Sequence, residues 1–373
     1  MNRFFVKFIL LEGIILLLNF VCFSQLSHRA SVRVAVAGIS HGHSSWIFGK
    51  KSTPDIEVVG IFEKDAELVE VYSKKYNLDK AIFYTDFDKM LDKLKPEAVL
   101  SFNPTNEHLS VIESCAPRGI HVMVEKPLAT SPFQVTRIIE LAKRYNIQVL
   151  TNYETSWYPS TEKTYQLVND SDFLGSIRKV IIRDGHEGAR NTEANKFFFR
   201  WLTDPVKNGG GALTDFGCYG ANLMTFLMKN QRPLSVIAIT RQFKPEIYPN
   251  VDDEATIIVS YPNAQCIIEA SWNWPFNRKD MEVYGETGYI IAENDSLVHF
   301  RNKKMKSEET KKYSAKDMNI IDNPFSYFTR VIRGEIKVPI NGTYSLDNNK
   351  LVVEILDAAK KSAKTGKVVY FKK

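Results

Sequence analysis

The order of strand-like and helix-like segments constrains this chain more than any other feature of its sequence. Between Ser31 and Asn152, short apolar runs alternate with segments whose apolar residues recur at helical spacing. Strands separated by helices of about 10–15 residues form βαβ units around a parallel sheet. The expected strands are Val32–Ala37, Glu57–Phe62, Ala98–Phe102, His121–Val124 and Gln148–Asn152, and the expected helices are Asp65–Tyr76, Asp86–Leu94, Asn106–Arg118 and Ser131–Tyr145.

The pattern changes after residue 153. One helix is expected near Thr161–Asn169, and strand-like runs then follow with few helices between them, which predicts an α+β domain with a largely antiparallel open sheet over residues 154–373. The C-terminal helix Leu346–Lys364 can pack back on the first domain. The expected strands are Lys179–Arg183, Val236–Arg241, Ala255–Tyr261, Gln265–Trp272 and Met281–Tyr284, and a further helix is expected at Asn323–Val331.

The N-terminus has the three parts of an export signal. Arg3 and Lys7 supply positive charge, an apolar run follows, and small residues stand at Cys22 and Ser24. We therefore predict a cleaved signal peptide over residues 1–24, an exported, periplasmic protein, and no stable membrane span in the mature form. A lipid anchor at Cys22 is the less favoured alternative, because bulky residues precede it.

Composition excludes several other classes. A hydrophobic fraction of 44% and a charged fraction of 25% are ordinary for a globular protein with a real core. The net charge of +6 is spread along the chain, and the basic cluster Lys303–Lys306 lacks neighbouring stacking aromatics, which argues against nucleic-acid binding. The four cysteines form no CxxC pair, so we expect buried free thiols. A homo-oligomer is compatible with this composition.

The first strand runs into a glycine-containing turn that suits a dinucleotide. Backbone N–H groups at such a strand–turn–helix junction hold a pyrophosphate, and the usual fingerprint is GxGxxG. Here Ser40 replaces the second glycine and His43 the third. No third metal ligand is evident near the His41/His43 pair, so we expect cofactor contacts and no metal. The predicted cofactor-binding residues of this turn are Gly38, Ser40, His41, Gly42 and His43.

An acidic residue at the end of the second strand strengthens this interpretation. We therefore predict that the first domain, residues 31–153, is a Rossmann NAD(P)-binding domain. Glu63 stands 25 residues after Gly38, where an acid accepts hydrogen bonds from the ribose 2′-OH. A carboxylate there repels a 2′-phosphate, which favours NAD. Lys64 beside it leaves NADP as an alternative.

Three motifs then occur in order along the chain. Asn103–His108 reads NPTNEH, Glu125–Pro127 reads EKP, and Gly209–Tyr219 reads GGGALTDFGCY. These resemble the (T/N)PxxxH, EKP and GGGxxxDxG-(His/Tyr) signatures of the glucose-fructose oxidoreductase/inositol dehydrogenase/MocA family. The resemblance covers nearly all of the chain from residue 31. The end of the third motif, with Tyr219, resembles the subgroup of glucose-fructose oxidoreductase and dihydrodiol dehydrogenase, whose motif reads GCY.

The resemblance implies an NAD(P)-dependent oxidoreductase with Lys126 beside the nicotinamide and the substrate. Oxidation of a secondary alcohol also needs a group that accepts the hydroxyl proton. We expect Lys126 and Tyr219 to handle that proton together, with the Lys126 ammonium stabilising a Tyr219 phenolate and Asp215 orienting the substrate hydroxyl. The remaining cofactor-binding residues that the resemblance implies are Asn103, Pro104, His108, Glu125 and Asn152.

Polar and aromatic residues before the glycine run suit the hydroxyls and faces of a sugar. We therefore predict that the substrate is a small sugar or sugar derivative, and the candidate residues are His186, Arg190, Arg200 and Trp201. Two alternatives stay open at this point. One is an NAD-dependent glycosidase that uses transient oxidation and elimination at the same site. The other is a non-catalytic sugar-binding protein, which the altered glycine turn favours.

Overall fold

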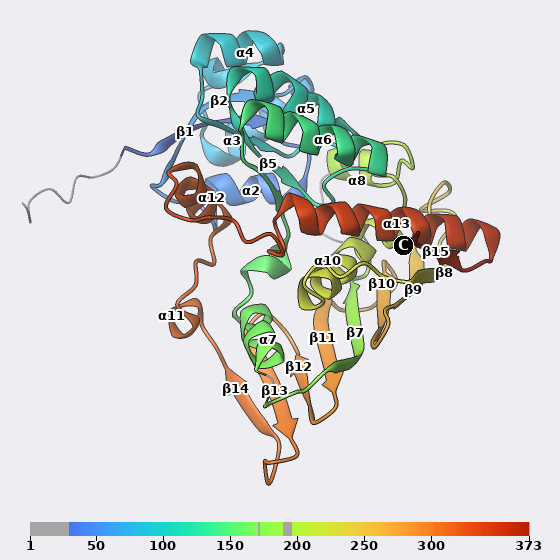
Figure 1. Cartoon of the computed structure of the whole chain (residues 1–373). Coiled ribbons are helices and arrows are strands. Elements are labelled where there is room, and N and C mark those ends of the chain that lie inside the picture. Colours follow the sequence, from blue (N-terminus) through green and yellow to red (C-terminus); the bar gives the residue numbers. More distant parts are fainter. Residues whose placement is uncertain (1–29, 171, 189–195, 373) are drawn as a thin grey trace, which may run out of the picture. The chain divides into compact units, whose positions relative to one another are not determined.

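The computed structural model describes residues 30–170, 172–188 and 196–372, and two sheets organise them (Figure 1). The predicted signal peptide with Cys22, and the candidate Arg190, lie outside the described residues. Within those residues, no helix combines the length and apolar character that a membrane crossing requires.

The first sheet has six strands in the order β3-β2-β1-β4-β5-β6, and every pairing is parallel. Helices cover both faces, so strands such as β4 and β6 are buried along their whole length, whereas β2 and β3 are only partly buried. The strands are β1 (Val32–Ala37), β2 (Ile56–Phe62), β3 (Phe83–Tyr84), β4 (Ala98–Ser101), β5 (His121–Glu125) and β6 (Val149–Asn152). The helices are α2 (Ser45–Phe48), α3 (Ala66–Tyr76), α4 (Phe87–Leu94), α5 (His108–Cys115) and α6 (Pro132–Tyr145).

Local capping explains where these helices begin. The Asp65 and Asp86 carboxylates and the Ser131 hydroxyl accept backbone N–H groups at the starts of α3, α4 and α6. The strand β3 was missed from the sequence because only two residues pair. The helix after the glycine turn is α2, which has four residues and ends at Gly49.

The second sheet has nine strands in the order β14-β13-β12-β11-β7-β10-β9-β8-β15, and only the β7–β10 pairing is parallel. With the parallel sheet before it, this confirms the predicted fold class. The strands are β7 (Ile177–Gly185), β8 (Ser235–Arg241), β9 (Glu254–Ser260), β10 (Gln265–Ser271), β11 (Arg278–Gly285), β12 (Gly288–Ala292), β13 (Leu297–Asn302), β14 (Glu309–Lys312) and β15 (Val369–Tyr370).

The C-terminal helix joins the cores of the two sheets. Val353 belongs to a cluster under the first sheet, whereas its neighbour Val352 belongs to the core of the second. Helix α13 contacts both α6 and α10 (Figure 1). The helices of this half are α7 (Pro159–Asn169), α8 (Lys196–Leu202), α9 (Ala212–Asp215), α10 (Gly217–Leu227), α11 (Ala315–Met318), α12 (Pro324–Ile332) and α13 (Leu346–Thr365).

The parallel sheet brings distant motifs to one edge. Strand β4 lies between β1 and β5, so the carboxyl ends of β1 and β5 open on the same side. The glycine turn follows β1, and Lys126 follows the last residue of β5. Ligands of open parallel sheets bind at this edge.

Candidate active site

Two cavities lie beside the glycine turn. The larger has a volume of about 580 Å³, and the smaller about 230 Å³. Residues lining the larger cavity include His41, Gly42, His43, Lys126, Glu154, His186, Asp215, Tyr219 and Lys279. Residues lining the smaller cavity include Gly38, Ser40, Glu63, Asn103 and Pro104. The structure thus divides most of the predicted site residues between two neighbouring spaces.

Gly38 and Glu63, the first glycine of the turn and the acid after the second strand, both line the smaller cavity. Gly38 has φ +71°, and a Cβ there would lie 3.0 Å from the Asn103 side chain. The Glu63 carboxylate accepts backbone N–H groups from Ile39 (3.1 Å), Lys64 and Asp65 (2.9 Å each). Burial raises the pKa of Glu63, although these three N–H groups oppose that rise. A carboxylate offers about four acceptor positions, so one is left for a ligand.

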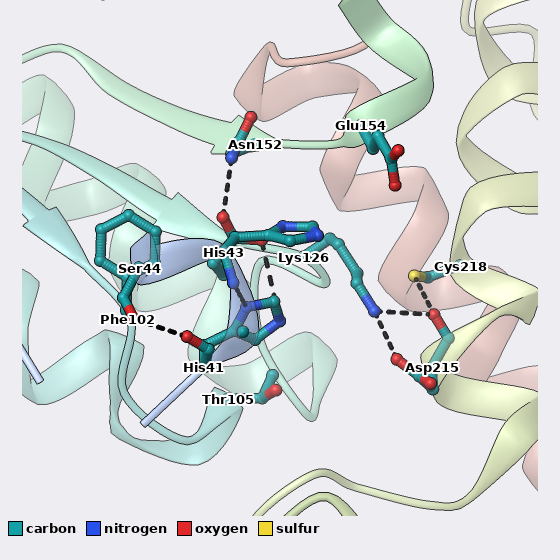
Figure 2. A network of polar contacts seen from close by, with 12 residues as sticks. His41, His43, Ser44, Phe102, Thr105, Lys126, Asn152, Glu154, Asp215 and Cys218 are labelled. Atoms are coloured by element: carbon teal, nitrogen blue, oxygen red, sulfur yellow. Dashed lines mark hydrogen bonds and ion pairs between the residues drawn. The ribbon is translucent and has the colours of Figure 1, made fainter. Parts of the chain in front are cut away.

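Lys126 and Asp215 form a buried ion pair at the larger cavity (Figure 2). The Lys126 ammonium donates to the Asp215 Oδ1 and also to its backbone carbonyl at 3.1 Å. Burial alone would lower the pKa of Lys126, but Asp215, by charge and hydrogen bond, acts together with Cys218 and Glu125 to hold that pKa above its ordinary value. Trp272 donates its indole N–H to the Asp215 Oδ2 at 3.0 Å. Both carboxylate oxygens therefore have protein partners, and Asp215 holds Lys126 in place.

Tyr219 lies beside this pair, but its proton state differs from the expectation. The Lys126 and Lys279 nitrogens lie 5.1 and 4.8 Å from the centre of its ring. Even so, burial raises the pKa of Tyr219 well above its ordinary value, and the Glu154 carboxylate adds to the rise. The prediction that Lys126 lowers this pKa is wrong for the structure as it stands, because desolvation of the phenolate outweighs the nearby ammonium groups.

Asp215 and Tyr219 do not lie on one continuous helix. Helix α9 ends at Asp215, Phe216 intervenes, and α10 begins at Gly217. Both side chains still line the same cavity.

The two histidines of the glycine turn meet an unexpected partner. The His43 Nδ1 lies 3.0 Å from the Glu125 Oε2, and the His41 Nε2 lies 3.9 Å from the same oxygen. The sequence suggested no third ligand near this pair, because Glu125 is 82 positions from His43. Attraction to both imidazoles overcomes the effect of burial and lowers the pKa of Glu125 to about 2. Burial lowers the pKa of His41 well below its ordinary value.

The candidate substrate residues separate into two groups. His186 lines the larger cavity, and its Nδ1 accepts the Gly188 N–H at 2.9 Å. Arg200 and Trp201, on α8, are not among the residues that line either cavity. The Arg200 guanidinium lies 5.7 Å from the Phe197 ring centre, and Trp201 is buried near His41, with ring centres 5.9 Å apart. Direct substrate contact by these two residues therefore has no geometric support.

Three predicted cofactor residues are buried away from both cavities. His108 is fully buried, and its Nδ1 lies 3.1 Å from the Leu128 carbonyl. The Asn152 amide donates to the Glu125 Oε1 at 2.7 Å. Neither cavity lining includes His108, Glu125 or Asn152, and their direct contact with a cofactor stays a prediction.

An ion pair at the larger cavity was missed from the sequence. Lys279, on β11, donates to the Glu154 carboxylate, and both side chains line the cavity. Lys279 pairs in register with Asp184 on β7, which is almost completely buried. No local signal identifies Lys279, because its partner Glu154 lies 125 positions away. Glu154 lies only two positions after the predicted cofactor residue Asn152, so it could have been included with it.

Comparison with known proteins agrees with this geometry. A family model described as "Oxidoreductase family, NAD-binding Rossmann fold" matches residues 32–153, and a "GFO/IDH/MocA C-terminal domain" model matches residues 163–291. The chain belongs to the Gfo/Idh/MocA family. This member is therefore an NAD(P)-dependent oxidoreductase with an NAD-binding Rossmann domain.

Individual relatives of this Gfo/Idh/MocA protein are distant. A trans-1,2-dihydrobenzene-1,2-diol dehydrogenase from Xenopus tropicalis is 24% identical over 82% of this chain and 89% of its own. An inositol dehydrogenase homologue from Azotobacter vinelandii, solved with NAD⁺, has a TM-score of 0.79 at 17% identity, covering 92% of this chain and 98% of its own. An aldose-aldose oxidoreductase from Caulobacter crescentus, solved with glycerol, has a TM-score of 0.75 at 18% identity, covering 91% of this chain and all of its own. The two structural matches establish the fold alone.

The residues around the smaller cavity fit a dinucleotide. Glu63 retains an acceptor position there, and Gly38 leaves the turn free of a Cβ that Asn103 would obstruct. In the turn itself, the N–H groups of Ile39 and His41 already bond within the protein. The chain therefore offers a ribose-binding acid and a glycine turn, with fewer free backbone donors than the turn alone suggests.

Proposed function

We propose that this protein transfers a hydride between a secondary hydroxyl of a sugar or sugar derivative and NAD. The observation that carries the proposal is the buried Lys126–Asp215 pair, which lies at the larger cavity beside the glycine turn. A vicinal diol is the favoured substrate unit, because a similar protein is a dihydrodiol dehydrogenase. That similarity and the Gly217-Cys218-Tyr219 sequence also support the GCY subgroup.

The bound nicotinamide would supply the hydride chemistry, and the chain supplies the proton chemistry. Lys126 has three N–H groups, of which two bond to Asp215. The third can donate to the substrate oxygen and stabilise it as charge develops. His186 accepts the Gly188 N–H on Nδ1, so its neutral ring carries the proton on Nε2 and offers a second donor to the cavity.

The protonation states also bear on the direction of reaction. Lys126 is an ammonium and Tyr219 a neutral phenol in this structure, because of the Asp215 pair and of burial. A site in this state can deliver a proton to a carbonyl oxygen as a hydride reaches its carbon. For oxidation, Lys126 or Tyr219 must first lose a proton before accepting one from the substrate.

The test is a search for NADH formation with a panel of sugars and cyclic polyols. Stoichiometric NADH and a ketone product support the dehydrogenase. Turnover with only catalytic NAD and release of a free alcohol would support a glycosidase and overturn the proposal. Sugar binding without any change of cofactor would support a non-catalytic binding protein, and would overturn it as well.

We also propose that the protein is exported. The support is the charged start, apolar run and small residues of positions 1–24. N-terminal sequencing of the protein from the periplasmic fraction should give a start within a few residues of Gln25. An intact Met1 on protein from the cytoplasm would contradict export.

A further inference from the structure

We propose that His41, His43 and Glu125 form a binding site for a divalent transition-metal ion such as Zn²⁺. The two histidines come from the glycine turn after β1, and the carboxylate is the last residue of β5. One ligand atom from each residue lies within 4.8 Å of the others. Zinc–ligand bonds of about 2.0–2.2 Å place ligand atoms roughly 3.3 Å apart in a tetrahedron. His43 Nδ1 and Glu125 Oε2 lie 3.0 Å apart as hydrogen-bond partners, so they must separate by only about 0.3 Å to reach this spacing.

The ligand set and its depth suit a metal. Two imidazoles and one carboxylate bind catalytic zinc and non-haem iron in other proteins, where they leave coordination positions open. Glu125 is 1% exposed and His41 is 3% exposed, so water cannot solvate the carboxylate. Its neighbour Lys126 is committed to Asp215. A buried carboxylate between two imidazoles is a place where a cation is favoured.

Outer hydrogen bonds hold the carboxylate in position, as they do around established metal sites. Asn152 donates to the Glu125 Oε1, which leaves Oε2 directed at the histidines. Trp157 in turn donates its indole N–H to the side-chain Oδ1 of Asn152 at 2.8 Å. This chain of bonds fixes the amide of Asn152 with its NH₂ group toward Glu125.

One hydrogen bond competes with the metal. The His41 Nδ1 accepts the His43 N–H at 3.0 Å, so a neutral ring carries its proton on Nε2, toward Glu125. Metal binding at Nε2 requires that proton to move to Nδ1, and the bond from His43 must then break. A Cβ at Gly42 would meet no atom within 4 Å, so the space beside this residue of the turn is open. The rival state is a metal-free network in which Glu125 accepts from the imidazoles.

The open coordination positions would face the larger cavity, because His41 and His43 line it. In that position the ion could bind hydroxyl oxygens of the substrate, and this clause alone rests on the proposed function. Among the residues that the structure describes, no fourth histidine, cysteine or carboxylate joins the group. Water or substrate would complete the coordination sphere.

The experiment measures metal binding without any activity. The full mature protein, free of a histidine tag and treated with chelator, is titrated with Zn²⁺ and Co²⁺ by calorimetry and visible absorption. Wild type should bind one ion per chain, and Co²⁺ should give the intense visible band of a four- or five-coordinate site. His43→Gln should weaken binding by at least ~100-fold, because even loss of an outer partner weakens metal binding by about 10–100-fold.

The matched control is His299→Gln. His299 lies near the surface, bonded to Glu293 at 2.6 Å and Thr310 at 2.9 Å, and its loss should leave binding unchanged. No binding to wild type, equal binding by His43→Gln, or loss in His299→Gln alone would each overturn the site. Circular dichroism checks that both variants fold. If His43→Gln does not fold, Glu125→Gln is the second variant, and it should also lose the ion.

The two proposals can fail separately. Protein that binds neither Zn²⁺ nor Co²⁺ in the titration but forms NADH from a polyol would overturn the metal site and leave the dehydrogenase standing. Binding of one metal ion per chain without NADH formation from any polyol would overturn the dehydrogenase and leave the metal site standing.

Discussion

The two sides of the glycine turn differ in the distance along the chain between the residues that build them. On the side of the smaller cavity, Gly38 and Glu63 lie one βαβ unit apart, and their partners are mainly backbone N–H groups. On the side of the larger cavity, Lys126 meets Asp215 across 89 positions and His43 meets Glu125 across 82. The first side can hold a dinucleotide with local structure. The second needs distant strands of the first sheet for His43 and Glu125, and the packing of both halves for Lys126 and Asp215.

We call the side of the larger cavity the assembled side and the side of the smaller cavity the local side. The largest expected effect is at the assembled side. Lys126→Met keeps the length of the side chain and removes its charge. It should lower kcat/KM by ~10²–10⁴, the contribution of a positioned acid–base group. NAD affinity should change little, because Glu63 lies at the other cavity. Steady-state kinetics and NAD titration of the same preparation check this, and near-full activity would remove Lys126 from the mechanism.

Tyr219→Phe tests whether this side acts as a unit. The single variant should lose a factor similar to that of Lys126→Met. The double variant should lose much less than the product, since residues that act together are not additive. Fully multiplicative losses would leave both residues important but contradict their coupling.

The same contrast explains how much could be predicted from the sequence. The strands and helices of the first domain agree closely, because apolar periodicity and caps such as Asp65 and Ser131 are local. The role of Glu125 was misjudged, because nothing near it in sequence shows that two imidazoles approach it. Lys279 was missed for the same reason, since its partner Glu154 belongs to another element. The raised pKa of Tyr219 follows from burial, which no motif encodes.

A second test concerns the packing beneath the assembled side. Burial lowers the pKa of His108 to about 4, whereas an unfolded histidine titrates near 6.5. As pH falls from 6.5 to 4, the unfolded chain takes up a proton that the folded chain resists, so stability falls by about 3 kcal/mol over that window. His108→Gln keeps a donor for the Leu128 carbonyl and cannot titrate. Denaturant unfolding at both pH values should show a smaller acid loss in the variant, and equal losses would contradict the assignment.

Glu63→Ala tests the local side with a smaller expected effect. Loss of a hydrogen bond from the ribose should weaken NAD binding by about 1–3 kcal/mol. NADP binding should weaken less or improve, because the carboxylate no longer repels a 2′-phosphate. Glu63 also accepts the Ile39 N–H, so the turn could loosen for a purely structural reason. Loosening of the turn would weaken the binding of NAD and NADP equally, so titration with each cofactor separates the two cases.

The smallest effect is expected for Ser40→Gly, which restores the second glycine of the fingerprint. The Ser40 hydroxyl donates to the Phe102 carbonyl at 3.4 Å, which is long for an O–H donor. Its loss, with the added freedom of glycine, should destabilise the fold by less than ~1 kcal/mol. If the local side already accepts a dinucleotide, NAD affinity should stay within about threefold, or ~0.6 kcal/mol. A tenfold gain in affinity would instead mean that the Ser40 side chain obstructs the pyrophosphate. Gly38 and Glu63 would then not be enough to hold a dinucleotide on the local side. The difference between a side built from local structure and a side assembled from distant residues would be smaller.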